Sequence, residues 1–222
     1  MKKKLLSILI ATAVCLSLTG CSALLNKALS GLSVSSDASE SEKSSENQSI
    51  SKVFTRGTWS GDTYTSDFFD VQITLPEGWA RATDEEIANT FGTVLSEMSS
   101  DTDYSKVYMI YDMAIANVSS GINLVFMMEN MTMYLGGTSI TEDGYLQITA
   151  SKLEQQGFTI GDTSDAELGG YPCKKLTAVY SDGTCQEYYF RRVGDYMAGV
   201  VGSYLPEYAD DYNVALNSIS KR

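Results

Sequence analysis

The sequence predicts an α+β domain in which an antiparallel sheet carries helices packed on its faces. Strand-like segments outnumber helical ones, and short turn signals typical of hairpins separate most neighbouring strands. Helical periodicity interrupts the strands at only three places. Runs of hairpins with a few segregated helices are typical of the α+β class. The chain has 222 residues, and we expect a single domain of this class over residues 54–222.

Residues 1–20 have the pattern of a secretory signal peptide. Three lysines precede an apolar run over Leu5–Leu18, and the small residue Gly20 follows this run. The run is too short to span a bilayer as a mature helix. The tetrad Leu18-Thr19-Gly20-Cys21 resembles the lipobox of bacterial lipoproteins. This resemblance implies cleavage before Cys21, lipidation of Cys21, and anchoring of the protein at the extracytoplasmic face of the bacterial cell membrane.

Residues 21–53 are expected to form a disordered, flexible tether between the lipid and the domain. From residue 22 to residue 52 there are 11 serines, and there is no proline or aromatic residue. Such a segment cannot bury enough apolar surface to offset the entropy lost on ordering. The tether therefore acts as a spacer.

Composition excludes several classes of function. The chain contains no histidine, which rules out Ser–His and Cys–His nucleophile pairs and histidine-ligated metal sites. The formal net charge of −12 argues against nucleic acid as a partner. The acidic residues from Asp101 onward resemble the spacing of an EF-hand calcium loop, but Lys106 stands at the position where that loop needs glycine. We expect no catalytic residue, no metal and no cofactor.

The first half of the domain is expected to contain a hairpin, a strand, a helix and two long strands. The hairpin turns at Gly61-Asp62, and the strand covers residues 71–75. Thr83 to Glu86 forms a capping box, and the apolar face of the following helix continues to Met98. The long strands, residues 107–115 and 122–128, are apolar on both faces, as expected for strands covered on both sides.

The second half is expected to begin with a helix capped by the box Ser139-Ile140-Thr141-Glu142 and ended by Gly157. Several strands follow, and Pro206 opens a last helix whose apolar side runs to Ile219. The expected strands are two short ones at 158–160 and 166–168, a hairpin of 171–180 with 184–192, and a strand at 196–204.

Cys173 and Cys185 are predicted to be free thiols. They flank Ser181-Asp182-Gly183, which predicts a hairpin turn. A two-residue loop places the two cysteines on opposite faces of the sheet. A three-residue loop places them on one face, but roughly 20 Å apart along the strands. A disulfide requires Cα atoms within about 7 Å.

Two motifs resemble the PsbP-like proteins. One is the strand and exit Val71-Gln72-Ile73-Thr74-Leu75-Pro76-Glu77-Gly78-Trp79 followed by the acidic helix start, and the other is Leu168-Gly169-Gly170-Tyr171-Pro172 before a hairpin. The resemblance implies an α/β/α sandwich with a central antiparallel sheet. The family includes photosystem assembly factors, a nuclear Ran-binding protein and many lipoproteins of unknown role. It has no catalytic residue to transfer, and a shared fold does not imply a shared function.

A possible ligand or partner surface is expected from Trp79, Tyr188, Tyr204 and Tyr208. Trp79 follows the strand exit, where it either caps a groove or packs under the following helix. The tyrosines could stack on sugars, although alternation along strands places about half of such residues in the core.

Asp112 is a charged residue inside an apolar strand. It is expected either to pair with Lys174 or Arg191 across the sheet or to line a pocket. The sequence leaves both possibilities open.

These features predict a membrane-anchored extracytoplasmic lipoprotein that is a non-catalytic binding or accessory module for an unknown protein or cell-wall partner. An alternative is a carbohydrate- or peptidoglycan-binding surface protein. A histidine-free hydrolase is a further alternative, and it requires two carboxylates about 5–9 Å apart in a cleft.

Overall fold

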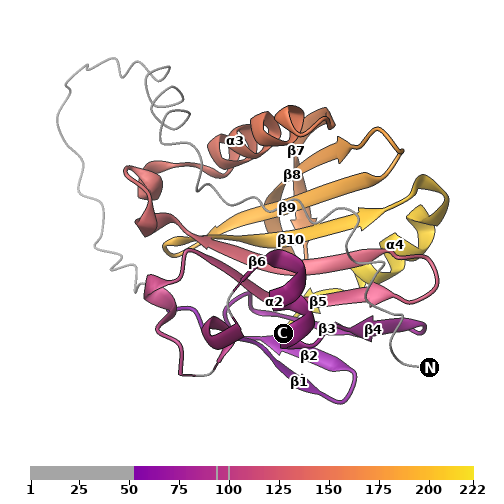
Figure 1. Ribbon diagram of the computed structural model, residues 1–222, viewed down its shortest axis with the longest axis horizontal. Helices are drawn as coiled ribbons and strands as arrows, with labels where there is room; N and C mark the ends of the chain where they lie inside the picture. Colours follow the sequence, from indigo (N-terminus) through magenta and orange to yellow (C-terminus); the bar gives the residue numbers. More distant parts are fainter. Residues whose placement is uncertain (1–52, 94, 100) are drawn as a thin grey trace.

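The computed structural model describes residues 53–93, 95–99 and 101–222. The expected signal peptide, the lipobox with Cys21 and the tether up to residue 52 lie outside the described residues. The described chain forms two antiparallel sheets and three α-helices (Figure 1).

The larger sheet has seven strands in the order β4-β5-β6-β10-β9-β8-β7, and all neighbours are antiparallel. The strands are β4 (Trp79–Arg81), β5 (Met109–Asn117), β6 (Asn123–Asn130), β7 (Thr159–Leu168), β8 (Tyr171–Val179), β9 (Cys185–Val193) and β10 (Tyr196–Tyr204). Every residue of β6 is buried, which agrees with the prediction of strands covered on both faces. The two short strands expected at 158–160 and 166–168 are one strand, β7, whose register shifts between Ile160 and Thr163.

The smaller sheet has four strands in the order β1-β2-β3-β11. They are β1 (Thr58–Ser60), β2 (Thr63–Ser66), β3 (Val71–Thr74) and β11 (Ile219–Lys221). The predicted first hairpin is confirmed, since Trp59 lies opposite Tyr64. The assignment of Ile219 to the last helix is wrong, because Ile219 pairs with Ile73 in β11. A three-residue strand whose partner is so distant in sequence leaves no local periodicity.

The predicted helix α2 (Asp84–Phe91) begins at the expected capping box, with reciprocal hydrogen bonds between Thr83 and Glu86. It ends earlier than expected, at Phe91, because Gly92 adopts the left-handed conformation with φ 67°. The chain then continues in short 3₁₀ turns. These are η3 (Leu95–Met98) and η4 (Tyr104–Lys106), and the later ones are η5 (Met131–Met133), η6 (Gly137–Ser139) and η7 (Pro206–Tyr208).

Helix α3 (Glu142–Gln155) is capped by Thr141 rather than by the expected Ser139. The Thr141 hydroxyl accepts from the Gly144 amide, 3.2 Å away. Glu142 is therefore the first helical residue and not the third, which a capping box requires, and its carboxylate accepts from the Arg192 amide of β9 at 3.1 Å. Helix α4 (Ala209–Asn217) follows the turn opened by Pro206, as predicted.

The core has two parts, one on each face of the larger sheet. Helices α2 and α3 cover one face, where Ile87 and Leu146 are buried against Met127 and Phe190. The smaller sheet and α4 cover the other face (Figure 1). The predicted α+β class, with antiparallel strands and helices on the faces, is confirmed. The second sheet was not predicted, and it takes much of the area expected for helices.

The β8–β9 hairpin has the three-residue loop Ser181-Asp182-Gly183, because Val179 lies opposite Cys185 and the Tyr180 amide donates to the Thr184 carbonyl. This register places Cys173 and Cys185 on one face and well apart along the strands. Both are free thiols, as predicted. Burial raises the pKa of Cys173 to about 11, which makes this thiol a weak nucleophile at neutral pH.

The described chain is packed from Phe54 onward. The Phe54 side chain is 2% exposed, and its ring lies edge-on to Phe68 at 5.1 Å and to Tyr104 at 4.7 Å between centroids. Edge-to-face pairs of this kind stabilise a core beyond the area they bury. The segment before β1 is therefore part of the folded core.

A chain that starts at Val53 is expected to be as stable as the full mature chain, whereas one that starts at Thr58 loses Arg56 as well as Phe54 and should lose at least about 3 kcal/mol. Urea unfolding followed by circular dichroism measures both. Limited proteolysis of the mature chain should accordingly leave a fragment beginning near Val53. Equal urea midpoints for the two shortened chains would contradict the core role of this segment.

Candidate functional site

A cavity of about 320 Å³ lies where the smaller sheet meets β4, β5 and the start of α2. It combines aromatic, apolar and charged side chains. The lining residues are Arg56, Gly57, Trp59, Tyr64, Arg81, Ala82, Thr83, Asp84, Ile87, Asp112 and Met113. A concave site with a few convergent polar groups is the usual form of a small-ligand pocket.

Asp112 reaches this cavity because β5 is irregular at this point. The register with β6 shifts between Tyr111 and Met113, so Asp112 is the extra residue of a bulge. Tyr111 packs against the α2 side of the sheet, and Met113 packs against the smaller sheet. Strict alternation along a strand would place these two residues on one face, and the bulge places them on opposite faces.

The Asp112 side chain is fully buried, and its carboxylate is bound by groups from the segment before β1 and from β2. It accepts hydrogen bonds from the Gly57 amide at 3.1 Å and from the Tyr64 hydroxyl. Nε of Arg56 lies 3.6 Å from Oδ1 of Asp112. Asp112 is thus both paired and part of a pocket wall.

The two predicted partners of Asp112 are engaged elsewhere. Lys174 pairs with Asp165 and Asp143, and Arg191 donates to the Phe69 carbonyl. The prediction of pairing with either residue is wrong. The bulge is the physical reason, since it directs Asp112 toward the segment before β1.

Arg56 joins four parts of the chain through one guanidinium group. Its two terminal nitrogens bind the two carboxylate oxygens of Asp84, each at 2.8 Å. They also donate to the carbonyl of Met98 at 2.6 Å and to the carbonyl of Asp112 at 2.9 Å. Bidentate arginine–carboxylate pairs fix geometry as well as adding energy. Arg56 therefore holds the segment before β1 against α2, η3 and β5.

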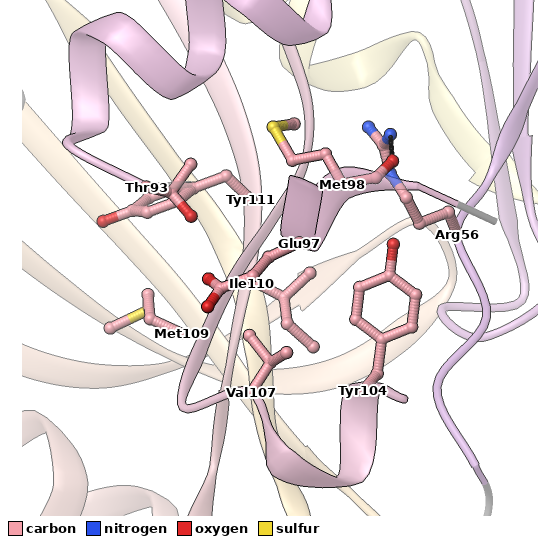
Figure 2. Close-up of a pocket in the computed structure, with 9 residues that line it drawn as sticks. All are labelled: Arg56, Thr93, Glu97, Met98, Tyr104, Val107, Met109, Ile110 and Tyr111. Atoms are coloured by element: carbon pink, nitrogen blue, oxygen red, sulfur yellow. Dashed lines mark hydrogen bonds between the residues drawn. The ribbon is translucent and has the colours of Figure 1, made fainter. Parts of the chain in front are cut away.

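Figure 2 shows the side of Arg56 that faces η3 and η4. Arg56 donates to the Met98 carbonyl beside the Tyr104 ring, and Ile110 and Val107 lie below. The hollow here is only about 10 Å³, which is about the space of one water molecule. This side of Arg56 is packed, and the room for a ligand lies on the Trp59 side.

Burial raises the pKa of Asp112 to about 6, although hydrogen bonds from Tyr64 and Gly57 and the charge of Arg56 oppose the shift. Burial lowers the pKa of Arg56, but the hydrogen bond and charge of Asp84 outweigh this effect and raise it above its usual value. The desolvation of Asp112 thus exceeds the attraction of its partners. The site holds a carboxylate whose charge changes in mildly acidic solution.

Trp59 and Arg81 lie together in the wall of the cavity. The Arg81 guanidinium lies 5.5 Å from the Trp59 ring centroid, and the Tyr64 ring lies 5.3 Å from it. A cation over an indole ring is a favourable contact. Trp59 is only half-buried, so a ligand entering the cavity would meet this ring.

The predicted surface of Trp79, Tyr188, Tyr204 and Tyr208 is not a single surface. Trp79 is 8% exposed and Tyr188 is 1% exposed, and they lie in the two different halves of the core. Tyr204 and Tyr208 are half-buried against the half that contains Trp79. Trp79 and Tyr188 are therefore corrected from candidate ligand contacts to core residues, since strand alternation points them inward.

Sequence reasoning missed Arg56 and underestimated Trp59 and Tyr64. Asp112 carried a usable signal, since a charge within an apolar strand requires a partner. The identity of that partner had no local signal, because Arg56 and Asp112 are distant in sequence.

Asp84 and Asp112 both line the cavity, as a hydrolase pair would. Both carboxylates, however, are engaged with the guanidinium of Arg56, which binds Asp84 with two hydrogen bonds.

Within residues 53–93, 95–99 and 101–222, no group of three or more Cys, Asp or Glu side chains is arranged to hold a metal ion. In the same part of the chain, no helix combines the length and apolar character needed to cross a membrane.

The sequence matches no known protein family and no curated protein. Among solved structures it is similar to cyanobacterial PsbP from Synechocystis sp. PCC 6803, with 10% identity, a TM-score of 0.46, and coverage of 81% of this chain and 98% of that one. It is also similar to LpqN of Mycobacterium tuberculosis, which is described as involved in cell envelope biogenesis, with 16% identity, a TM-score of 0.39, and coverage of 68% and 82%.

The yeast Ran-binding protein Mog1p of Saccharomyces cerevisiae is a third similar structure, with 8% identity, a TM-score of 0.37, and coverage of 68% of this chain and 90% of that one. The PsbP-like proteins named from the sequence motifs thus recur among the structural neighbours. All three TM-scores are below 0.5, so neither membership of a family nor a function follows from them.

Proposed function

We propose that this protein is a lipid-anchored module on the extracytoplasmic face of a bacterial membrane, and that its α+β domain binds a ligand without catalysing a reaction. The ligand site is the cavity around Trp59 and Asp112. A non-catalytic role fits the ion pairs of the site, because Asp84 and Asp112 are both engaged with Arg56.

The observation that carries the proposal is the cavity of about 320 Å³ in which Trp59, Tyr64 and Arg81 converge with Asp84 and Asp112. Aromatic rings supply apolar contact area, while the charged groups and Thr83 supply orientation. Sugars bind to this combination of a ring face and hydrogen-bonding groups. Trp59 in the cavity wall therefore favours a cell-wall carbohydrate as the ligand class.

Soluble muropeptides released from purified peptidoglycan should change the fluorescence of the protein in a saturable way. The fluorescence change can be assigned to the cavity, because Trp59 lines it and the other tryptophan, Trp79, is buried elsewhere in the core. Trp79→Phe is the matched control and should keep the signal, whereas Trp59→Phe should lose it. A signal that survives in Trp59→Phe would place binding outside this cavity. No saturable change with the unaltered chain would reject the carbohydrate ligand.

The membrane anchor is tested separately. Cys21→Ala should leave the precursor uncleaved by the lipoprotein peptidase and should abolish incorporation of labelled palmitate, because the acylated sulfur is missing. Cys15→Ala lies within the expected signal peptide and is the matched control, with lipid incorporation unchanged. Palmitate incorporation into the Cys21→Ala protein would disprove the lipobox interpretation.

A further inference from the structure

A second polar cluster lies away from the cavity around Trp59 and Asp112, on strands β8, β9 and β10. Its centre is the carboxylate of Glu187, a buried residue. Glu187 accepts hydrogen bonds from the hydroxyls of Tyr189 at 2.6 Å and Tyr204 at 3.2 Å. The ammonium group of Lys175 lies 2.7 Å from Oε1 of Glu187 and 5.2 Å from the Tyr189 ring centroid.

A carboxylate beside a tyrosine ring is a suitable environment for an ammonium group. The ring attracts the cation through its quadrupole, and the carboxylate supplies the opposite charge. Burial raises the pKa of Glu187, but the hydrogen bonds from Lys175 and Tyr189 outweigh burial and lower it below its ordinary value. Glu187 is thus held in its charged form at neutral pH.

The cluster opens into a groove of about 390 Å³. The β7–β8 turn, the end of α4 and β11 form its walls, and Lys175 and Tyr189 lie on its floor. Glu167 supplies a carboxylate and Asn217 an amide to the lining, and Glu187 meets the groove through its contacts with Lys175 and Tyr189. The groove therefore combines negative charge, hydrogen-bonding groups and room for a small ligand next to the ammonium position.

Lys175 is more exposed than the carboxylate that it pairs with. Its side chain is 27% exposed, whereas that of Glu187 is 9% exposed. A lysine has a flexible stem, so its ammonium group can leave the Tyr189 ring for solvent without moving the backbone. The loss of the ion pair is offset when another ammonium group takes its place.

We propose that this groove binds a ligand bearing a primary alkylammonium group, and that the ammonium group of Lys175 occupies the ligand's position when no ligand is present. The ligand's cation would lie between Glu187 and the Tyr189 ring, and its remainder would extend toward Glu167 and Asn217. This site goes beyond the proposed function, since it uses different strands and a different cavity.

When the Lys175 ammonium group occupies the position, an external ligand can bind only the fraction of molecules in which the position is free. Its apparent affinity is the intrinsic affinity multiplied by this fraction. Removing the Lys175 ammonium group should therefore tighten binding of an external amine. n-Pentylamine is the probe, because it is a primary alkylammonium ion at neutral pH with a stem similar to that of lysine. 1-Pentanol, similar in size and uncharged, is the matched control ligand.

Chemical shifts of the amides of Gly169, Gly170 and Asn217 report binding to the full chain. The unaltered protein is expected to show saturable shifts with n-pentylamine and none with 1-pentanol. Lys175→Ala should bind n-pentylamine at least tenfold more tightly. Glu187→Gln in the Lys175→Ala background should weaken binding at least tenfold, and Tyr189→Leu supplies a second variant if Glu187→Gln does not fold.

Three results would overturn the proposal. One is the absence of saturable shifts in the unaltered protein even if Lys175→Ala binds, because the intact protein would then not bind an external ammonium group in this groove. Another is equal binding of n-pentylamine and 1-pentanol. The third is an affinity that does not change in Lys175→Ala. The fluorescence of Trp59 should not respond to n-pentylamine, which separates this site from the cavity around Asp112.

Discussion

Replacing Asp112 by alanine is expected to destabilise the domain by about 3 kcal/mol. Removing one partner of a buried ion pair leaves the other partner uncompensated and costs about 3–5 kcal/mol. The Asp112 change also leaves the Tyr64 hydroxyl and the Gly57 amide without their acceptor. The lower end of the range applies because Arg56 keeps its two hydrogen bonds to Asp84. Urea unfolding at pH 7 measures the loss.

Asp84→Ala is the matched control, because Asp84 binds the same guanidinium at the surface. The Asp84 side chain is 48% exposed, whereas that of Asp112 is fully buried. Exposed ion pairs contribute about 0–1 kcal/mol, so Asp84→Ala should cost about 1 kcal/mol or less. Equal losses for the two variants would show that burial of Asp112 does not determine the strength of the site.

Asp112 also predicts a pH dependence of stability. Its pKa is raised in the folded state to about 6 from the usual 3.8. Between these values the folded state binds more protons than the unfolded state, so the contribution of Asp112 to stability falls as pH rises. Asp112→Asn lacks this contribution. The unfolding free energy of the unaltered protein minus that of Asp112→Asn should therefore fall between pH 4 and pH 6.5 and level off above pH 6.5.

Glu129→Gln is expected to stabilise the domain, and more so in alkaline solution. Glu129 is fully buried in β6, where the Tyr145 hydroxyl and the charge of Lys152 compensate its carboxylate only in part. Burial raises the pKa of Glu129, and nearby Tyr145 and Lys152 oppose the shift only in part. A buried charge without good hydrogen bonds is costly, whereas the neutral amide has nearly the same shape.

The direction of this pH dependence follows from the raised pKa of Glu129. The folded state retains the Glu129 proton at a pH where the unfolded chain has released it, so stability falls as pH rises from about 4.5 through the raised folded-state pKa. Over this window the loss is on the order of a few kcal/mol. Unfolding by urea at pH 5, 7 and 9 should show that the advantage of Glu129→Gln grows with pH.

Tyr145→Phe tests the same pH dependence through a neighbour of Glu129. The Tyr145 hydroxyl opposes the shift in the pKa of Glu129, so its removal should steepen the loss of stability with pH. If the advantage of Glu129→Gln is the same at pH 5 and pH 9, Glu129 is not the group responsible.

Local chemistry allowed several elements to be predicted from the sequence. The capping box of Thr83 and Glu86 satisfies backbone groups within one turn, so it needs no distant partner. The hairpin turns at Gly61-Asp62 and Ser181-Asp182-Gly183 are equally local, and they set which strands pair. The α+β class followed from these elements together.

The class of the fold, the start of α2 and most strands could be predicted from the sequence alone, which also marked Asp112 as a buried charge in need of a partner. The pairing of β11 with β3, the bulge that directs Asp112 toward Arg56, and the place of Trp59 rather than Trp79 in a cavity wall became visible only in three dimensions. These features depend on contacts between distant segments. Their energies come from packing and desolvation in three dimensions, which leave no periodic pattern along the chain.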